Sequence, residues 1–300
     1  MTSKICGIIG FPLERTLSPA LHEAGFRKLE LDWAYVPFRV EPGKADRAIE
    51  AMRVLGIEGL SVTIPHKGQA AACADELTST AEKVGAVNTL FWSKDRSLIV
   101  GDNTDVDGFV AGLQESLSLS LEGQNLLLLG AGGSARAVAY AALQAGCAGV
   151  CVAARRVSAA SRLAEWLAAL AQKTWRGRKR CELKAVPLRE RELLDAASRA
   201  TLVVNATPVG SDALSCPLPD DAFVESAAYY DLIYYPDPTP FVARARSVGA
   251  KAAGGFEMLV AQGALQFEIW TSRSAPVGAM RAAARACMNT WLQKCDGTAE

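Results

Sequence analysis

The sequence predicts an α/β protein of two domains, each made of strands that alternate with helices. Short apolar runs recur between longer amphipathic stretches, a pattern typical of largely parallel sheets covered by helices. The chain has 300 residues, enough for two domains of ordinary size, and a new strand–loop–helix series begins near Asp105. We therefore expect the first domain to end near residue 104.

In the first hundred residues, each expected strand is a short apolar run. The helix after the first strand opens with Ser18-Pro19, a favourable cap and first-turn pair. The expected strands are 5–10, 33–40, 59–64, 87–92 and 98–101, and the expected helices are 18–29 and 44–55.

The second domain continues the alternation. Its first strand, 125–129, is apolar throughout and leads through a glycine-rich loop into a helix that ends near 145. Further strands are expected at 150–154, 202–205 and 229–233, a further helix at 158–171, and mostly helix from Gly255 to Lys294.

Composition excludes several classes of function. Lys plus Arg number 32 and Asp plus Glu also number 32, so no net charge favours nucleic acid or an anionic membrane. No stretch approaches about 18 uninterrupted apolar residues, and Pro12 and Glu14 break the apolar run at the N-terminus. We expect a cytoplasmic protein that binds neither nucleic acid nor a membrane.

No metal site is expected. The eight cysteines form no C-x-x-C pair and only two histidines are present, so these thiols are expected to be structural or incidental. The one basic cluster, residues 172–182, is expected to be a solvated loop between a helix and a strand, because nucleic-acid binding would need a larger patch.

A glycine-rich loop follows strand 125–129 at once and opens a helix, the context that a dinucleotide-binding motif requires. Gly130 permits the tight turn, and Gly132 lets the backbone approach a pyrophosphate. Free N–H groups and a partial positive charge at the helix N-terminus suit phosphates. The sequence thus predicts a Rossmann domain whose pyrophosphate loop holds Gly130, Ala131, Gly132, Gly133 and Ser134.

The end of strand 150–154 favours NADP over NAD. NAD-binding domains usually place a carboxylate there for the ribose hydroxyls, whereas this chain has Arg155 and Arg156 and no carboxylate until Glu165. Two guanidinium groups suit the dianionic 2′-phosphate of NADP. The alternative is a pair of solvated arginines at a strand end.

Four polar clusters in the first domain lie near the ends of apolar strands. They hold Thr16 and Ser18, then Ser61, Thr63 and Lys67, then Asn88, and finally Asp102 to Asp105. Each alone is compatible with a cap or a turn. Because open α/β sheets bind ligands at strand ends, the four together indicate a small-molecule site. Two hydroxyls near a helix N-terminus, at Thr16 and Ser18, suit a carboxylate.

With these motifs the sequence resembles the shikimate dehydrogenases. The matching segments are GFPLERTLSPALH, GLSVTIPHK, GAVNTL, GDNTDVDG, GAGGSARA, NATPVG, YDLIY and GGFEMLVAQGA, in the family's order, from residue 10 to about 264. The resemblance implies an open, mostly parallel substrate domain over 1–104, completed by 256–300. It also implies a Rossmann NADP-binding domain over 105–255, with a cleft between the two.

The resemblance also implies an activity, the reversible NADPH-dependent reduction of 3-dehydroshikimate to shikimate in aromatic amino acid biosynthesis. Lys67 and Asp105 match the catalytic pair. The matching substrate-binding residues are Thr16 and Ser18 for the carboxylate, Thr63, Asn88 and Gln262 for other groups, Ser61 at a usual asparagine, and Tyr234 in the pocket wall. The matching cofactor residues are Gly130 to Ser134, Arg155 with Arg156 beside it, Thr207 near the adenosine and Gly255 near the nicotinamide.

Three departures from the family pattern leave alternatives open. Arg15-Thr16 stands for His-Ser, Ser61 for asparagine, and Ala154-Arg155-Arg156 for Asn-Arg-Thr. The alternatives are a quinate or aminoshikimate dehydrogenase that uses NAD or NADP and, more remotely, a non-catalytic sensor of a shikimate-like ligand. A monomer and a homodimer are both compatible with the sequence.

The chemistry of a ring alcohol suggests roles for the pair. Oxidation needs a hydride acceptor, which the cofactor supplies, and a group that manages the proton. We hypothesise that Lys67 exchanges this proton while Asp105 holds the lysine and the substrate hydroxyl in line. His66 is expected to have a packing or surface role, because adjacent strand residues point to opposite faces.

Overall fold

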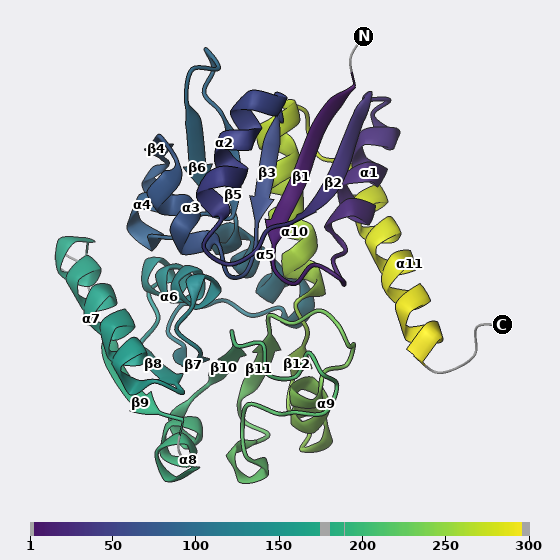
Figure 1. The fold of residues 1–300 in the computed structure, drawn as a ribbon. Coiled ribbons are helices and arrows are strands. Elements are labelled where there is room, and N and C mark those ends of the chain that lie inside the picture. The colour runs from purple at the N-terminus through teal and green to yellow at the C-terminus, as the bar shows by residue number, and fades with distance from the viewer. Residues whose placement is uncertain (1–2, 175–180, 189, 296–300) are drawn as a thin grey trace. The chain divides into compact units, whose positions relative to one another are not determined.

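The computed structural model describes residues 3–174, 181–188 and 190–295 (Figure 1). The chain divides into two compact units, Met1–Gly108 with Val260–Glu300 and Phe109–Leu259. The divisions fall inside two helices, α5 (Asp105–Leu117) and α10 (Phe256–Thr271). The functional boundaries expected near residues 104 and 255 stay a prediction.

The first unit is built on a six-stranded sheet of order β2-β1-β3-β5-β6-β4 (Figure 1). Its strands are β1 (Lys4–Gly10), β2 (Trp33–Arg39), β3 (Gly59–Val62), β4 (Glu76–Leu77), β5 (Thr89–Trp92) and β6 (Ile99–Asp102). The strand β5 runs antiparallel to both neighbours, β3 and β6, while β1 is parallel to β2 and β3. The helices are α1 (Ser18–Lys28), α2 (Ala45–Leu55), α3 (Lys67–Cys73), α4 (Ser79–Val84), and later α11 (Val277–Cys295).

The two faces of this sheet are covered by different helices. On one face Leu60 packs in a cluster with Ile49 and Met52 of α2, which recur at helical spacing. Because side chains alternate along a strand, Ser61 points to the other face, where it meets α10. A glycine is needed at residue 59 there, since a Cβ atom would lie 2.0 Å from the Trp270 indole nitrogen. The helix α10 can therefore lie close against β3.

The second unit is a doubly wound sheet of order β12-β11-β10-β7-β8-β9, parallel throughout its described pairings. Its strands are β7 (Asn125–Leu129), β8 (Gly149–Ala154), β9 (Glu182–Pro187), β10 (Leu202–Asn205), β11 (Ala228–Asp231) and β12 (Ala252–Ala253). Its helices are α6 (Gly133–Ala145), α7 (Val157–Thr174), α8 (Glu190–Arg199), α9 (Pro240–Ser247) and the 3₁₀ turn η1 (Asp220–Ala222). This is the strand order of a Rossmann domain, which confirms the predicted fold class.

Several boundaries differ from the sequence-based expectation. The strand expected over 59–64 ends at Val62, because Ile64-Pro65 forms a turn before α3. Strand β9 was not expected: its residues alternate charged and apolar and it lies at the sheet edge, where charged residues are usual. In the basic segment 172–182, Gln172 belongs to α7 and Glu182 to β9, while 175–180 lie outside the described residues. Among the described helices, none is long and apolar enough to cross a membrane.

Candidate functional site

The two residues expected to be catalytic form a buried ion pair. Lys67 Nζ lies 2.5 Å from Asp105 Oδ2, and the side chains are only 12% and 7% exposed. Lys67 is the first residue of α3 and Asp105 the first residue of α5, directly after β3 and β6 in the fold. The Asn103 side chain accepts the Asp105 N–H at 3.1 Å and so fixes the start of α5. An ammonium group and a carboxylate are thus in direct contact in the first unit.

Asn88 joins this pair to the neighbouring loop. Its Nδ2 donates to Asp105 Oδ1 and to Thr104 Oγ1, both at 2.9 Å. Its Oδ1 accepts the backbone N–H of Thr104 and the hydroxyl of Thr89, both at 2.8 Å. Because a backbone N–H can only donate, the amide orientation is fixed with its N–H groups toward Asp105. Gln262 Oε1 lies 3.4 Å from the same Nδ2, at the edge of the cluster.

Ser61 is buried in a second hydrogen-bond network. Its hydroxyl lies 2.6 Å from the Tyr35 phenol and 2.6 Å from Gln266 Oε1. Neither Tyr35 nor Gln266 was predicted as a site residue, because both lie among apolar residues in the sequence. One signal was available for Gln266, because it follows Gln262 by four residues and so shares a helix face with it.

The expected carboxylate-binding residues lie at the start of α1. Thr16 Oγ1 accepts the Ser18 N–H at 3.3 Å, and Ser18 itself is buried. Thr63 is half-buried just beyond the end of β3. These three residues belong to the same unit as Lys67 and Asp105.

Both histidines are buried in the first unit. His66 Nε2 lies 2.8 Å from the Val40 carbonyl oxygen, which agrees with the expected packing role, although His66 precedes α3 rather than lying in a strand. His22 stacks on Tyr35 with ring centroids 4.4 Å apart. Burial lowers the pKa of His22 to about 3, so its ring is neutral at physiological pH.

The glycine-rich loop of the second unit has the geometry of an anion-binding site. Gly130 has φ +111°, and a Cβ atom there would lie 2.8 Å from the Ala206 carbonyl oxygen. At Gly132, which precedes α6, an added Cβ would meet nothing within 4 Å, and no side chain caps the helix. The first turn of α6 therefore presents its backbone to open space, as phosphate binding requires.

Arg155 and Arg156 follow β8 directly and are both exposed. Neither guanidinium group forms an ion pair with another residue in the described part of the chain. The two cations thus stand at the carboxyl end of the strand next to the glycine-rich loop, where a nucleotide 2′-phosphate is expected.

A buried carboxylate organises the loops after β10 and β11. Asp231 is fully buried and accepts hydrogen bonds from Asn205 Nδ2 and the Ile233 N–H at 3.0 Å and from the Thr239 hydroxyl at 2.8 Å. Burial raises the pKa of Asp231 to about 7, against the effect of these donors. Asn205 Oδ1 in turn accepts the N–H and the hydroxyl of Thr207, so the carboxylate fixes the Thr207 loop.

Tyr234 and Gly255, expected near the substrate and the nicotinamide, both belong to the second unit. The structure explains the glycine by packing: a Cβ at Gly255 would lie 2.3 Å from the Leu232 carbonyl oxygen. No group of three or more His, Cys, Asp and Glu side chains that could hold a metal occurs within the described ranges.

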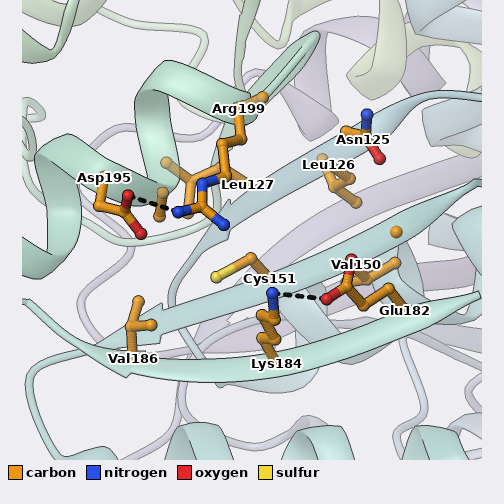
Figure 2. Close-up of a pocket in the computed structure, with 13 residues that line it drawn as sticks. Asn125, Leu126, Leu127, Val150, Cys151, Glu182, Lys184, Val186, Asp195 and Arg199 are labelled. Carbon is orange, nitrogen blue, oxygen red and sulfur yellow. Dashed lines mark hydrogen bonds and ion pairs between the residues drawn. The ribbon is translucent and has the colours of Figure 1, made fainter.

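A cavity of about 240 Å³ lies in the second unit beside α8 and the first residues of β7 and β8 (Figure 2). Two exposed ion pairs border it, Glu182 with Lys184 at 2.5 Å and Asp195 with Arg199 at 2.8 Å. The expected cofactor residues follow the other, carboxyl ends of these strands, and none of them lines the cavity. Because its charged groups already pair with each other, we do not assign the chemistry to this cavity.

Two family models match the chain. The shikimate dehydrogenase substrate binding domain matches residues 8–90, and the shikimate 5′-dehydrogenase C-terminal domain matches residues 255–285. The chain is 40% identical to a protein of Methanopyrus kandleri named shikimate dehydrogenase (NADP(+)), over 94% of each chain. It is 36% identical to a protein of the same name from Desulforamulus reducens, over 93% of this chain and 94% of the relative.

Solved structures show the same architecture. A shikimate dehydrogenase in complex with NADP+ is 32% identical, with a TM-score of 0.83 over 95% of this chain and 96% of that one. The Thermus thermophilus enzyme in complex with NADP(H) and shikimate is 34% identical, with a TM-score of 0.81 over 94% and 99%. A quinate dehydrogenase from Corynebacterium glutamicum in complex with NAD is 28% identical, with a TM-score of 0.81 over 95% and 99%. The fold alone therefore does not choose between the two ring acids.

Proposed function

The chain belongs to the shikimate dehydrogenase family, and from this premise we propose that it is an NADP-dependent dehydrogenase that interconverts 3-dehydroshikimate and shikimate. The observation that carries the proposal is the buried Lys67–Asp105 pair, held in place by Asn88. A charged pair costs free energy to bury, and a non-catalytic sensor has no need of it. The small-molecule substrate and the place in aromatic amino acid biosynthesis follow from the same premise.

The second unit supplies groups that fit NADP. The loop from Gly130 to Ser134 would hold the pyrophosphate, because Gly132 is open and the N-terminus of α6 lacks a side-chain cap. Arg155, with Arg156 beside it, would bind the 2′-phosphate, and this is why NAD is the less favoured cofactor. Thr207 would lie near the adenosine and Gly255 near the nicotinamide. When bound, the nicotinamide accepts or supplies the hydride.

The first unit supplies groups for the ring acid. Thr16 and Ser18 would bind the carboxylate through their hydroxyls, while Thr63 and Gln262 would bind ring hydroxyls. Asn88 and Ser61 would border the same site from their buried networks. Tyr234, which matches a family residue of the substrate pocket, is also assigned to substrate binding. The functional division proposed is a substrate domain over 1–104 with 256–300 and a cofactor domain over 105–255.

The proton step is assigned to the Lys67–Asp105 pair. In the direction of reduction, the Lys67 ammonium group donates a proton to the oxygen of 3-dehydroshikimate that becomes the hydroxyl, and Lys67 is left as a neutral amine. In shikimate oxidation the neutral amine takes this proton back from the hydroxyl. Asp105 keeps the ammonium group in place through Oδ2, while its Oδ1 is held by Asn88. Asn88 thus prevents the carboxylate from rotating away as the charge on the lysine changes.

We also propose that the protein works in the cytoplasm, as a monomer or a homodimer. The described cysteines other than Cys295 are free thiols, which fits the reducing cytoplasm. A monomer and a homodimer both agree with two units that each have their own sheet.

Initial rates of NADP and NAD reduction by shikimate and by quinate test the proposed function. We expect the highest kcat/KM for the pair NADP and shikimate. A preference for quinate would support the second candidate, which Thr16 and Ser61 favour because both alter groups expected around the ring. If neither acid reduces either cofactor, aminoshikimate is the next substrate to try, and inactivity with all three would contradict the proposal.

The cofactor assignment predicts the effect of reversing the charge at residue 155. Arg155→Asp should lower kcat/KM for NADP by about 10- to 100-fold, since hydrogen bonds to charged groups contribute about 1.5–3 kcal/mol. The value for NAD should change little, because NAD has no 2′-phosphate. Arg162→Asp, the same charge change at an exposed position on α7, serves as the control. Equal loss in the two variants would contradict a specific role for Arg155.

A further inference from the structure

A buried amide on α10 fixes the direction of the hydrogen bonds beside the catalytic pair. Gln266 is 2% exposed, and its side chain bridges β3 and β5. One of its terminal atoms lies 3.0 Å from the Asn88 carbonyl oxygen. Because a backbone carbonyl only accepts hydrogen bonds, this atom must be the nitrogen. The other terminal atom, 2.6 Å from the Ser61 hydroxyl, is therefore the oxygen.

This orientation accounts for the single proton of Ser61. The Gln266 oxygen only accepts, so Ser61 must donate its proton to it. The Tyr35 phenol, 2.6 Å from the same hydroxyl, must then be the donor in their hydrogen bond. Tyr35 is held by stacking on His22 and is itself buried, so the arrangement is fixed. Ser61 is left with one lone pair and no proton to offer.

Ser61, whose hydroxyl can accept but not donate a further hydrogen bond, lies next to the proposed catalytic residues. In the antiparallel pair of β3 and β5, Ser61 lies opposite Thr89, the residue after Asn88. It therefore borders the cluster that ends in Asp105. Thr16, in the proposed carboxylate-binding site, differs from Ser61 in this respect. Its oxygen accepts the Ser18 N–H, so its hydroxyl proton stays available for a carboxylate.

We propose that Gln266 is a specificity-determining residue that acts through Ser61, by holding its proton so that Ser61 only accepts a hydrogen bond from the substrate. The partner of Ser61 is then a ring hydroxyl, which has a proton to donate. A carboxylate or a keto oxygen has none and is excluded there. This inference rests on the proposed function and names which chemical group of the ring acid this side of the site selects.

The test compares shikimate with its 4-deoxy-4-fluoro and 5-deoxy-5-fluoro analogues, in which fluorine replaces one ring hydroxyl that does not react and can accept a hydrogen bond but not donate one. In the parent enzyme, one analogue should lose about 5- to 10-fold in kcat/KM, the scale of a neutral hydrogen bond. Ser61→Ala should abolish this discrimination. Gln266→Met, which keeps the length of the side chain but removes the acceptor, should reduce it to within about twofold, because Ser61 regains a proton that it can donate to the fluorine.

Tyr35→Phe is the matched control, since it removes the other hydrogen bond to the same hydroxyl. Ser61 still donates to Gln266 in this variant, so the discrimination should persist. If the role of Gln266 were purely structural, Gln266→Met and Tyr35→Phe would change the discrimination alike. Equal discrimination in the parent and in Gln266→Met would overturn the inference. So would unchanged discrimination in Ser61→Ala, which needs no folded Gln266 variant. Failure of the proposed function is distinct, because the parent would then not oxidise shikimate.

Discussion

Lys67→Met should lower kcat for shikimate oxidation by about 100- to 10 000-fold, the usual contribution of a general acid–base group. The physical reason is that the variant keeps the length of the buried side chain but cannot take the proton. The KM for shikimate should change far less, since the carboxylate and the other hydroxyls are bound elsewhere. Steady-state kinetics with saturating NADP measures both parameters.

Two further variants separate chemistry from charge and stability. Lys94→Met removes an exposed lysine of the same unit and should leave kcat unchanged. Asp105→Asn should also have a strongly lowered kcat. The kcat of the double variant, Lys67→Met with Asp105→Asn, should be no lower than that of Lys67→Met alone, because both residues serve the same proton transfer. A Lys67→Met enzyme with parental kcat, or additive losses in the double variant, would contradict the assigned roles.

The strands and glycine-rich loop of the second unit were predictable because their signals are local. The strand over 125–129 is a continuous apolar run, and the turn at Gly130 follows it within the same short segment. Strand β9 was not predictable by the same reasoning, since an edge strand needs no continuous apolar sequence. The turn at Ile64-Pro65 was read as strand because its apolar residue continues the pattern of β3.

In the candidate site, too, some features could be predicted from the sequence and others could not. Sequence motifs were enough to identify Lys67 and Asp105 as the catalytic pair. A motif does not say which group donates and which accepts in each hydrogen bond. The bond between Ser61 and Gln266 spans 205 positions in the sequence, so only the fold brings the two together. The side-chain hydrogen bonds of Asn88 likewise join it to Asp105 and to Gln262, which lie 17 and 174 positions away in the sequence. What the sequence left open is therefore the placement of protons, which decides what each side chain can still offer to a substrate.

The free energy of unfolding of the parent should fall, relative to that of Asp231→Asn, as the pH rises from about 4 to about 7. Burial raises the pKa of Asp231 to about 7 in the folded protein, from an ordinary value of 3.8. Over this interval the unfolded chain releases the proton while the folded protein keeps it, so the folded state loses its advantage as the pH rises. Each unit of pKa difference corresponds to about 1.4 kcal/mol, which gives a total of about 4 kcal/mol.

Urea denaturation of both proteins at pH 5, 6, 7 and 8, with the second unit followed separately, measures this difference. Asp212→Asn is the control: it lies in the same unit, and hydrogen bonds from Ser215 and Leu214 lower its pKa to about 2. The difference in free energy of unfolding between Asp212→Asn and the parent should not vary across these pH values. If the difference between the parent and Asp231→Asn is also constant, Asp231 is ionised throughout, and the three donors around it outweigh the cost of its burial.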